Sequence, residues 1–285
     1  FATIGVLVST FLIATGMYYL FGLFGLEVDY LSCLLFGALI SPTDPIAVLG
    51  ILKQAKAPKK LEIKIVGESL FNDGVGVVVF LTLLQIAELG IGQVTAGEIA
   101  FLFAEEVGGG ILLGIGLGYL AYQMMRRIDN YEVEVMITLA VVMVGYSLAS
   151  YLHFSVPLAM VAAGLFLGHD RLRGKSMSDQ TEIYVDKFWE MIDVLCNAVL
   201  FVLMGLVIIT LPNDSLYWVI GLVSIPLALL SRAAALFLPI ALLRKRLEFI
   251  PYTNAMMTWG GLRGGISIAL ALSLPTSVPR ELFLT

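Results

Sequence analysis

The sequence predicts an all-α membrane protein of about nine spans, two of which are interrupted inside the bilayer. Three observations lead to this fold class. Of the 285 residues, 59% are hydrophobic and only 14% are charged, whereas soluble domains have about 25% charged residues. The apolar residues are gathered in stretches of about 20, the length at which a helix crosses the hydrocarbon core. Two of these stretches are interrupted near their centres, one by Pro42 and Pro45 and the other by Gly260, Gly261, Gly264 and Gly265.

The expected spans, in chain order, are residues 2–24, 31–52, 63–88, 99–125, 133–152, 155–169, 188–211, 216–243 and 254–274. We read all 285 residues as one transmembrane domain. Because the first residue is Phe rather than Met and the chain opens inside an apolar stretch, we expect this domain to be part of a longer protein, cut at both ends.

Basic residues give the orientation of these spans. The loops after the first, third, fifth and seventh spans contain no Lys or Arg. Most of the 17 basic residues follow the other spans, namely Lys53, Lys56, Lys59, Lys60, Lys64, Arg126, Arg127, Arg171, Arg173, Lys175, Lys187, Arg244, Lys245 and Arg246. Since Lys and Arg mark cytoplasmic loops, the first span runs outward from the cytoplasm. The second and ninth spans therefore run in opposite directions.

The second and ninth spans are also the two that should break. Pro42 and Pro45 lack backbone N–H groups and push the residue before each of them away from helical geometry. The ninth span contains four glycines, Gly260, Gly261, Gly264 and Gly265. Two broken spans of opposite direction, one in each half, predict an inverted-repeat transporter bundle with its site where the two discontinuous helices cross.

Asp44 lies in the first break. A charged group at mid-span costs about 2.5–3.5 kcal/mol on insertion scales and is a functional candidate for that reason. Carbonyl groups freed by the break could coordinate a cation, and Asp44 could balance the partial positive charge at the start of the next half-helix. The alternative is a simple proline kink with Asp44 at an aqueous edge.

The third span contains a polar cluster, in which residues 68–73 read Glu-Ser-Leu-Phe-Asn-Asp. Ser69, Asn72 and Asp73 are spaced i, i+3 and i+4, which places them on one stripe of a helix. Oxygen ligands from these side chains and from an unwound helix suit a small cation such as Na⁺ or Li⁺. One carboxylate that binds either this cation or a proton is sufficient for exchange. The alternative is a buried polar network that only orders the helices.

Arg263, in the second break, is expected to pair with Glu68. A guanidinium keeps its proton and must be paired where it is buried. The role of this pair would be structural, and the ion would contact Asp73. The alternative is that Arg263 extends to an interface.

A second polar set lies on the seventh and eighth spans. Glu190, Asp193 and Asn197 are spaced i, i+3 and i+7, on one face of a helix that starts on the cytoplasmic side. They could line a funnel that attracts cations, with Arg232 of the next span paired to one of the acids. Solvated acids at an interfacial helix start explain the same spacing equally well.

Three motifs, in this order, resemble the monovalent cation/proton antiporter family and its sodium/proton exchanger branch. Residues 41–45 read Ser-Pro-Thr-Asp-Pro, residues 67–74 read Gly-Glu-Ser-Leu-Phe-Asn-Asp-Gly, and residues 259–264 read Trp-Gly-Gly-Leu-Arg-Gly. Residues 1–10 and 188–205 also resemble segments of the family. The likeness therefore covers nearly the whole chain.

The resemblance implies a homodimer in a bacterial-type plasma membrane that works by alternating access, with further spans before the first residue. It matches Asp73 to the ion- and proton-binding aspartate and Asn72 to its neighbour. Ser69 and the Thr43 carbonyl match additional Na⁺ ligands, and Glu68 with Arg263 matches the family ion pair. Asn rather than Asp at position 72 resembles the electroneutral, one-for-one branch.

Other functions stay open. K⁺/H⁺ exchange would use the same ligand types, because these do not fix the size of the cation cavity. A cation channel is a further alternative. Asp44 and Asp73 could instead form an intramembrane aspartyl protease dyad, although such enzymes have Gly-x-Gly-Asp at the second aspartate and here Gly-Val-Gly follows Asp73. We expect a protein that is not an enzyme, whose partners are monovalent cations, protons and the lipid bilayer, with no cofactor and no nucleic acid.

Overall fold

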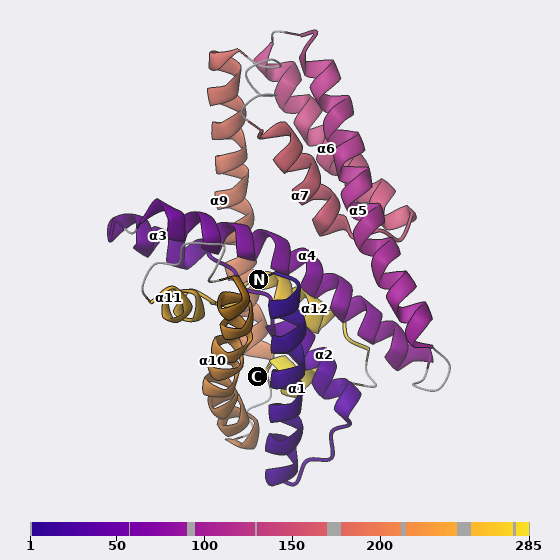
Figure 1. The fold of residues 1–285 in the computed structure, drawn as a ribbon, viewed down its shortest axis with the longest axis vertical. Coiled ribbons are helices and arrows are strands. Elements are labelled where there is room, and N and C mark those ends of the chain that lie inside the picture. The colour runs from indigo at the N-terminus through magenta and orange to yellow at the C-terminus, as the bar shows by residue number, and fades with distance from the viewer. Residues whose placement is uncertain are drawn as a thin grey trace. The chain divides into compact units, whose positions relative to one another are not determined.

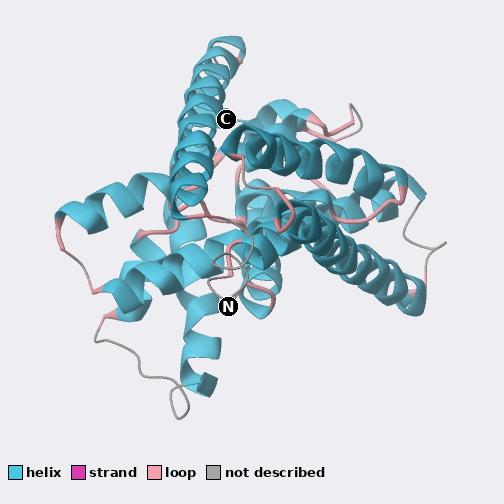
Figure 2. Ribbon diagram, turned by 90° about the horizontal axis from the view of Figure 1, so that it is seen from above, coloured by secondary structure: helices cyan, strands magenta, loops and turns pink. Residues whose placement is uncertain are grey.

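The computed structural model describes residues 2–56, 58–89, 95–128, 130–169, 178–211, 215–243, 252–275 and 278–284. All regular elements in these ranges are helices (Figures 1 and 2), which confirms the predicted all-α class. The helices form two compact units. Unit 1 consists of Phe1–Thr95 and Met204–Thr285, and unit 2 consists of Ala96–Leu203.

Unit 1 contains both broken spans and one buried core beside them. Its helices are α1 (Ile4–Leu23), α2 (Tyr30–Ile40), α3 (Ile46–Gln54), α4 (Lys59–Leu89), α10 (Ser215–Leu243), α11 (Thr253–Trp259), α12 (Gly265–Leu272) and α13 (Arg280–Leu284). α1 packs against α2 and α10 (Figure 1). An apolar core joins α3, α4, α10 and α11 and consists of Val48, Leu52, Leu61, Ile65, Leu236 and Met257. This core fixes α3 and α11, each of which flanks one of the breaks.

Unit 2 contains α5 (Ala96–Met125), α6 (Tyr131–Tyr151), α7 (Val156–Leu167) and most of α9 (Asp179–Thr210). α5 and α7 pack with their backbones in contact, because a Cβ on Gly114 would overlap the carbonyl oxygen of Ala159. Small residues permit this kind of approach between helices in lipid.

Three helices are preceded by a residue whose side chain accepts a hydrogen bond from a free backbone N–H of the first turn. Asp29 accepts from a backbone N–H of α2 at 2.9 Å, Asn130 from one of α6 at 2.9 Å, and Ser155 from one of α7 at 3.5 Å. Asp, Asn and Ser are the residues that favour such positions. The starts of these helices therefore follow from the sequence.

Six helices of the described residues are long and apolar enough to cross a membrane, over Ile4–Leu23, Leu61–Glu88, Gly97–Met125, Tyr131–Tyr151, Thr181–Ile209 and Ser215–Leu242. The protein is therefore a multi-pass membrane protein. The predicted second and ninth spans are the broken pairs α2/α3 and α11/α12.

The sixth predicted span, residues 155–169, corresponds to a short helix, and the seventh begins earlier than predicted. The sixth is α7, which has 12 residues and is about 18 Å long, shorter than the hydrocarbon core of about 30 Å. Gly168 ends it. The seventh is α9, which begins at Asp179 rather than at residue 188.

Candidate ion-binding site

The two breaks of unit 1 meet each other. The first lies between α2 and α3 at residues 41–45, and the second lies between α11 and α12 at residues 260–264. The N–H of Asp44 donates to the carbonyl oxygen of Leu262 at 2.8 Å, and the two residues form an antiparallel bridge. The prediction of two discontinuous helices that meet at their breaks is therefore confirmed.

Asn72 of α4 ties the first break to the helix beside it. Its Nδ2 donates to Oγ1 of Thr43 at 2.8 Å and to Oε1 of Glu68 at 3.2 Å. Its Oδ1 accepts from the N–H of Thr43 at 3.4 Å. Asn72 and Thr43 are both buried. Because the amide of Asn72 uses one N–H for Thr43 and the other for Glu68, it links the first break to Glu68.

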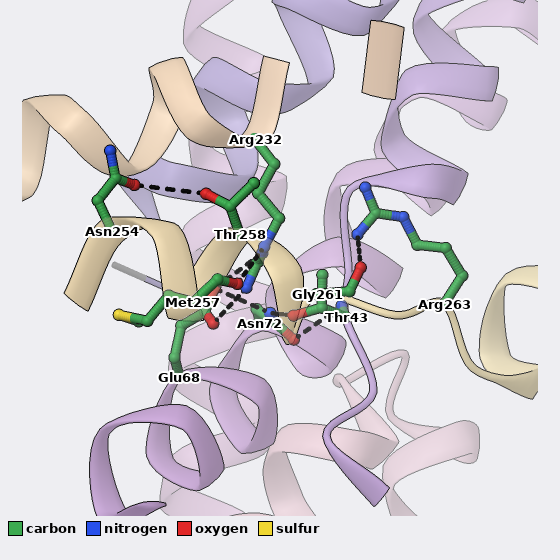
Figure 3. Close-up of polar contacts among 9 residues, drawn as sticks. All are labelled: Thr43, Glu68, Asn72, Arg232, Asn254, Met257, Thr258, Gly261 and Arg263. Atoms are coloured by element: carbon green, nitrogen blue, oxygen red, sulfur yellow. Dashed lines mark hydrogen bonds and ion pairs between the residues drawn. The ribbon is translucent and has the colours of Figure 1, made fainter. Parts of the chain in front are cut away.

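Arg232 of α10 is the ion-pair partner of Glu68. Nη2 of Arg232 lies 2.8 Å from Oε2, and Nη1 donates to Oε1 at 3.3 Å (Figure 3). The Nε of Arg232 donates to the carbonyl oxygen of Met257 in α11 at 3.0 Å. Both side chains are at most 7% exposed, so each charge needs the other for its stabilisation. Polar contacts thus run from the first break through α4 and α10 to α11.

The structure corrects the predicted pairing of Glu68 with Arg263. Nη1 of Arg263 donates to the carbonyl oxygen of Gly261 at 3.0 Å, within its own break. Figure 3 shows Arg263 on the opposite side of Gly261 from Glu68. The physical reason is that α10 shares a core with α4, which brings Arg232 to Glu68.

Two glycines allow the breaks to approach their neighbours. A Cβ on Gly76 of α4 would overlap the ring of Pro42 in the first break. A Cβ on Gly261 would overlap the Nε of Arg232. Any larger side chain at either position would have to displace a part of the network.

Asp73 and Ser69 lie on α4 next to this network. α4 is one continuous helix over Lys59–Leu89, so the spacing of four residues places both side chains on the same side of it. Ser69 is buried and Asp73 is half-buried. Asp73 is therefore more accessible than Glu68, the other acid of this part of α4.

The carboxylate of Asp44 lies at the start of two half-helices. Asp44 comes shortly before α3, as predicted, and its Oδ2 is 2.6 Å from where a Cβ of Gly264 would be. Gly264 directly precedes α12. The free N–H groups of both helix starts give partial positive charge that a carboxylate stabilises. Asp44 thus joins the two breaks by charge as well as by its backbone bond.

The oxygen atoms at this place suit a monovalent cation. The predicted ligands are the Asp73 carboxylate, the Ser69 hydroxyl and the Thr43 carbonyl, all hard donors. In the described part of the chain, no group of three or more His, Cys, Asp or Glu side chains is arranged to hold a metal ion.

The second predicted set lies elsewhere. Glu190 and Asp193 are exposed and Asn197 is half-buried, all on the part of α9 that belongs to unit 2. Glu190 lies well inside α9 rather than at its start. Arg232 pairs with Glu68, so the expected pairing of Arg232 with an acid of this set is wrong.

Sequence reasoning missed the role of Arg232 and a contact of Thr10. Arg232 is the only charged residue in the 29 residues of α10, and a lone charge in the middle of an apolar helix is a strong signal for a buried partner. The Oγ1 of Thr10 in α1 donates to Oγ of Ser41 at 3.1 Å. A hydroxyl on an apolar helix gives no such signal, because it can bond to its own backbone.

Known proteins are similar to this chain in sequence and in fold. The model of the family described as "Sodium/hydrogen exchanger, transmembrane" matches residues 1–285. The chain is 51% identical over 288 aligned positions to the Na(+)/H(+) antiporter NhaP of Pseudomonas aeruginosa, covering 100% of this chain and 68% of that protein. It is 35% identical to the Na(+)/H(+) antiporter NhaH of Halobacillus dabanensis, covering 96% of this chain and 66% of that protein.

The fold is similar to that of a solved antiporter. The structure of the sodium proton antiporter MjNhaP1 from Methanocaldococcus jannaschii superimposes with a TM-score of 0.79 at 22% identity, covering 99% of this chain and 70% of that one. The chain spans about two thirds of the length of the two curated relatives. The family match and these relatives show that the chain belongs to the transmembrane sodium/hydrogen exchanger family.

Proposed function

We propose that this protein exchanges Na⁺ or Li⁺ for H⁺ across a bacterial plasma membrane, one cation for one proton. The observation that carries the proposal is the meeting of the two breaks at Asp44 and Leu262, beside the half-buried Asp73. The names of the two bacterial relatives, both Na(+)/H(+) antiporters, support the choice of ions.

Asp73 is the group that we propose binds the ions. Its carboxylate holds either a proton or a cation, because binding of one removes the charge that attracts the other. Ser69 and the carbonyl of Thr43 supply further oxygen ligands for the dehydrated cation. Competition at one carboxylate is sufficient to couple the two fluxes.

Charge balance supports a one-for-one exchange. Asp73 with Na⁺ and Asp73 with a proton have the same net charge, and Glu68 is neutralised by Arg232. The Na⁺-bound and the protonated forms therefore have a similar free-energy cost when the site moves through the low-dielectric interior. The unloaded form would have an uncompensated carboxylate, which is expensive in lipid. This difference favours alternating access of loaded forms and disfavours a leak.

The other residues hold the site in place. Asn72 fixes Thr43 to Glu68, and Asp44 stabilises the starts of α3 and α12. We propose no enzymatic activity for Asp44 and Asp73, because each has one of these roles. We also propose that the complete protein works as a homodimer.

The test is ion exchange by the full-length protein in proteoliposomes with a preset, acidic interior. Addition of Na⁺ or Li⁺ outside should collapse the pH gradient, and K⁺ should not. Asp73→Asn should abolish the response, because an amide cannot exchange a proton for a cation. Glu132→Gln, at an exposed acid on α6, is the control and should leave it intact.

Each outcome bears on a different part of the proposal. If Asp73→Asn still responded, the assignment of the ion-binding carboxylate would be wrong. A response to K⁺ and not to Na⁺ would make the protein a K⁺/H⁺ exchanger with the same site. A Na⁺ current at constant internal pH would indicate a channel.

A further inference from the structure

A small cavity lies beside the ion pair, among α1, α2, α4 and α10. Gly5, Ser9, Ser41, Glu68 and Arg232 line it together with three aliphatic residues, and its volume is about 10 Å³ for the centre of a water molecule. A single water needs roughly 10–15 Å³ by this measure, together with two to four polar partners. All side chains around the cavity are buried. The cavity therefore has the size and the polarity for one water molecule.

Ser9 presents a hydroxyl that needs a partner. It is 4% exposed, and its Oγ has no hydrogen-bond partner among the residues that the structure describes. A buried hydroxyl without a hydrogen bond costs about 1–3 kcal/mol. Because Ser9 lines the cavity, a molecule in the cavity is the partner within its reach.

The groups opposite Ser9 have hydrogen-bonding capacity left. Ser41 donates from Oγ to the carbonyl oxygen of Gly37 at 2.7 Å and accepts from Thr10 at 3.1 Å, which leaves one acceptor position on its oxygen. The described bonds of Arg232 use one N–H on each of its three nitrogens, out of five N–H groups. Donors and acceptors thus face the cavity from α1, from α10 and from the first break.

We propose that one water molecule occupies this cavity and bridges the Ser9 hydroxyl to Ser41 and to the Glu68–Arg232 pair. Its donors and acceptors match, since the water accepts from Arg232 and donates to Ser41 or Ser9. A cation is a poor occupant because the guanidinium of Arg232 repels it and Glu68 is already neutralised. Ser9 is then a positioning residue that acts on the ion pair through the water.

The functional part of this inference rests on the proposed exchange. Glu68 holds Asn72, and Asn72 holds Thr43 of the first break. A water that fixes the geometry of the pair therefore also fixes the break. Loss of its hydrogen bond to Ser9 should lower the maximal exchange rate by about 3- to 10-fold, the effect of one such bond. The apparent KM for Na⁺ should change less, because the water does not contact the cation.

Three variants of the full-length protein test the inference. Ser9→Ala removes the hydroxyl. Gly5→Ala adds a methyl group next to the cavity that Gly5 lines, without overlap with any atom within 4 Å, and is designed to narrow the space for the water. Gly22→Ala is the matched control, because Gly22 is also on α1, also has open space around a Cβ, and does not line this cavity. Alanine in place of a helical glycine favours folding in both glycine variants.

The first readout is a high-resolution structure of the wild type and of Gly5→Ala. We expect a density peak within hydrogen-bond distance of Ser9 and Arg232 in the wild type, and none in Gly5→Ala. An empty cavity in the wild type, in a map that shows other buried waters, would overturn the proposal. This readout does not depend on ion exchange. The presence of the water can therefore be tested even if the protein does not exchange Na⁺.

The second readout is the exchange rate in proteoliposomes. Ser9→Ala and Gly5→Ala should lose rate with little change in KM, while Gly22→Ala keeps the wild-type rate. Wild-type rates in both Ser9→Ala and Gly5→Ala would show that the water has no positioning role. A rise in KM with an unchanged maximal rate would place the effect at the cation ligands instead and would also contradict it.

Discussion

Nη2 of Arg232 lies 2.8 Å from Oε2 of Glu68 in a buried ion pair, although the two residues are 164 positions apart in the chain. The pair fixes α10 to α4, because the guanidinium cannot release its proton to become neutral. Arg232→Ala should lower the free energy of unfolding by about 3–5 kcal/mol, since Glu68 would be left as an unpaired buried charge. The melting temperature of the full-length protein in detergent measures this loss.

Arg263→Ala is the comparison for this prediction. Arg263 bonds to the carbonyl oxygen of Gly261, so its loss should cost less, about 1.5–3 kcal/mol. The double variant Glu68→Gln with Arg232→Met removes both charges and should recover part of the stability that Arg232→Ala loses. Equal losses for the two single arginine variants would contradict the pairing.

Asn72→Asp should destabilise the protein in a pH-dependent way. The side chain of Asn72 lies 3.2 Å from Oε1 of Glu68, so a second carboxylate there would repel the first. Protonation of either acid removes the repulsion. The melting temperature should therefore be lowest where both acids are ionised and should rise as the pH falls.

Asn72→Ala separates the repulsion from the loss of hydrogen bonds. It removes the bonds to Thr43 and Glu68 without adding a charge. Its melting temperature should be reduced by a similar amount at every pH, relative to the wild type. If Asn72→Asp behaved in the same pH-independent way, the distance between these two side chains would not be as the structure describes.

Gly76→Ala should destabilise the first break. A Cβ at this position would overlap the ring of Pro42, and overpacking of this kind costs about 1–3 kcal/mol. Gly67→Ala, on the same helix, meets no atom within 4 Å and should be neutral or stabilising by about 0.4–1 kcal/mol. Thermal unfolding of both variants checks the difference, and a similar loss in both would argue against the contact.

Local chemistry made the breaks predictable from the sequence. Pro42 and Pro45 lack N–H groups, and the paired glycines at 260–265 favour unwinding, so neither break depends on distant residues. The helix spacing also directs Asn72 with Ser69 and Asp73 to one side of α4, but it does not select Thr43 as the partner of Asn72.

Pairings across the chain were not predictable in this way. Glu68 had two candidate arginines of equal charge, and only the packing of α10 against α4 selects Arg232. The start of α9 was placed too late because Asp179 and the polar residues after it fail a hydropathy criterion, although the helix continues through them.

The predicted cation funnel gives Glu190 and Asp193 a role in cation entry, which a double variant tests. Both are exposed acids on α9, and their field attracts cations only over about a Debye length. The double variant Glu190→Gln with Asp193→Asn should raise the apparent KM for Na⁺ by a few fold at low ionic strength. In about 1 M choline chloride the difference from the wild type should vanish. A salt-independent rise would mean that these acids bind the ion directly.

Competition at Asp73 should make the apparent KM for Na⁺ depend on pH. At low pH a proton occupies the carboxylate, so a higher Na⁺ concentration is needed to displace it. The KM should then rise up to about tenfold for each pH unit, because each unit changes the proton concentration tenfold. The maximal rate should change much less over the same range. Initial rates in proteoliposomes at several Na⁺ concentrations and pH values measure both quantities. A falling maximal rate at constant KM would instead place the titrating group outside the cation site, and Asp73 would no longer explain the coupling of the two ions.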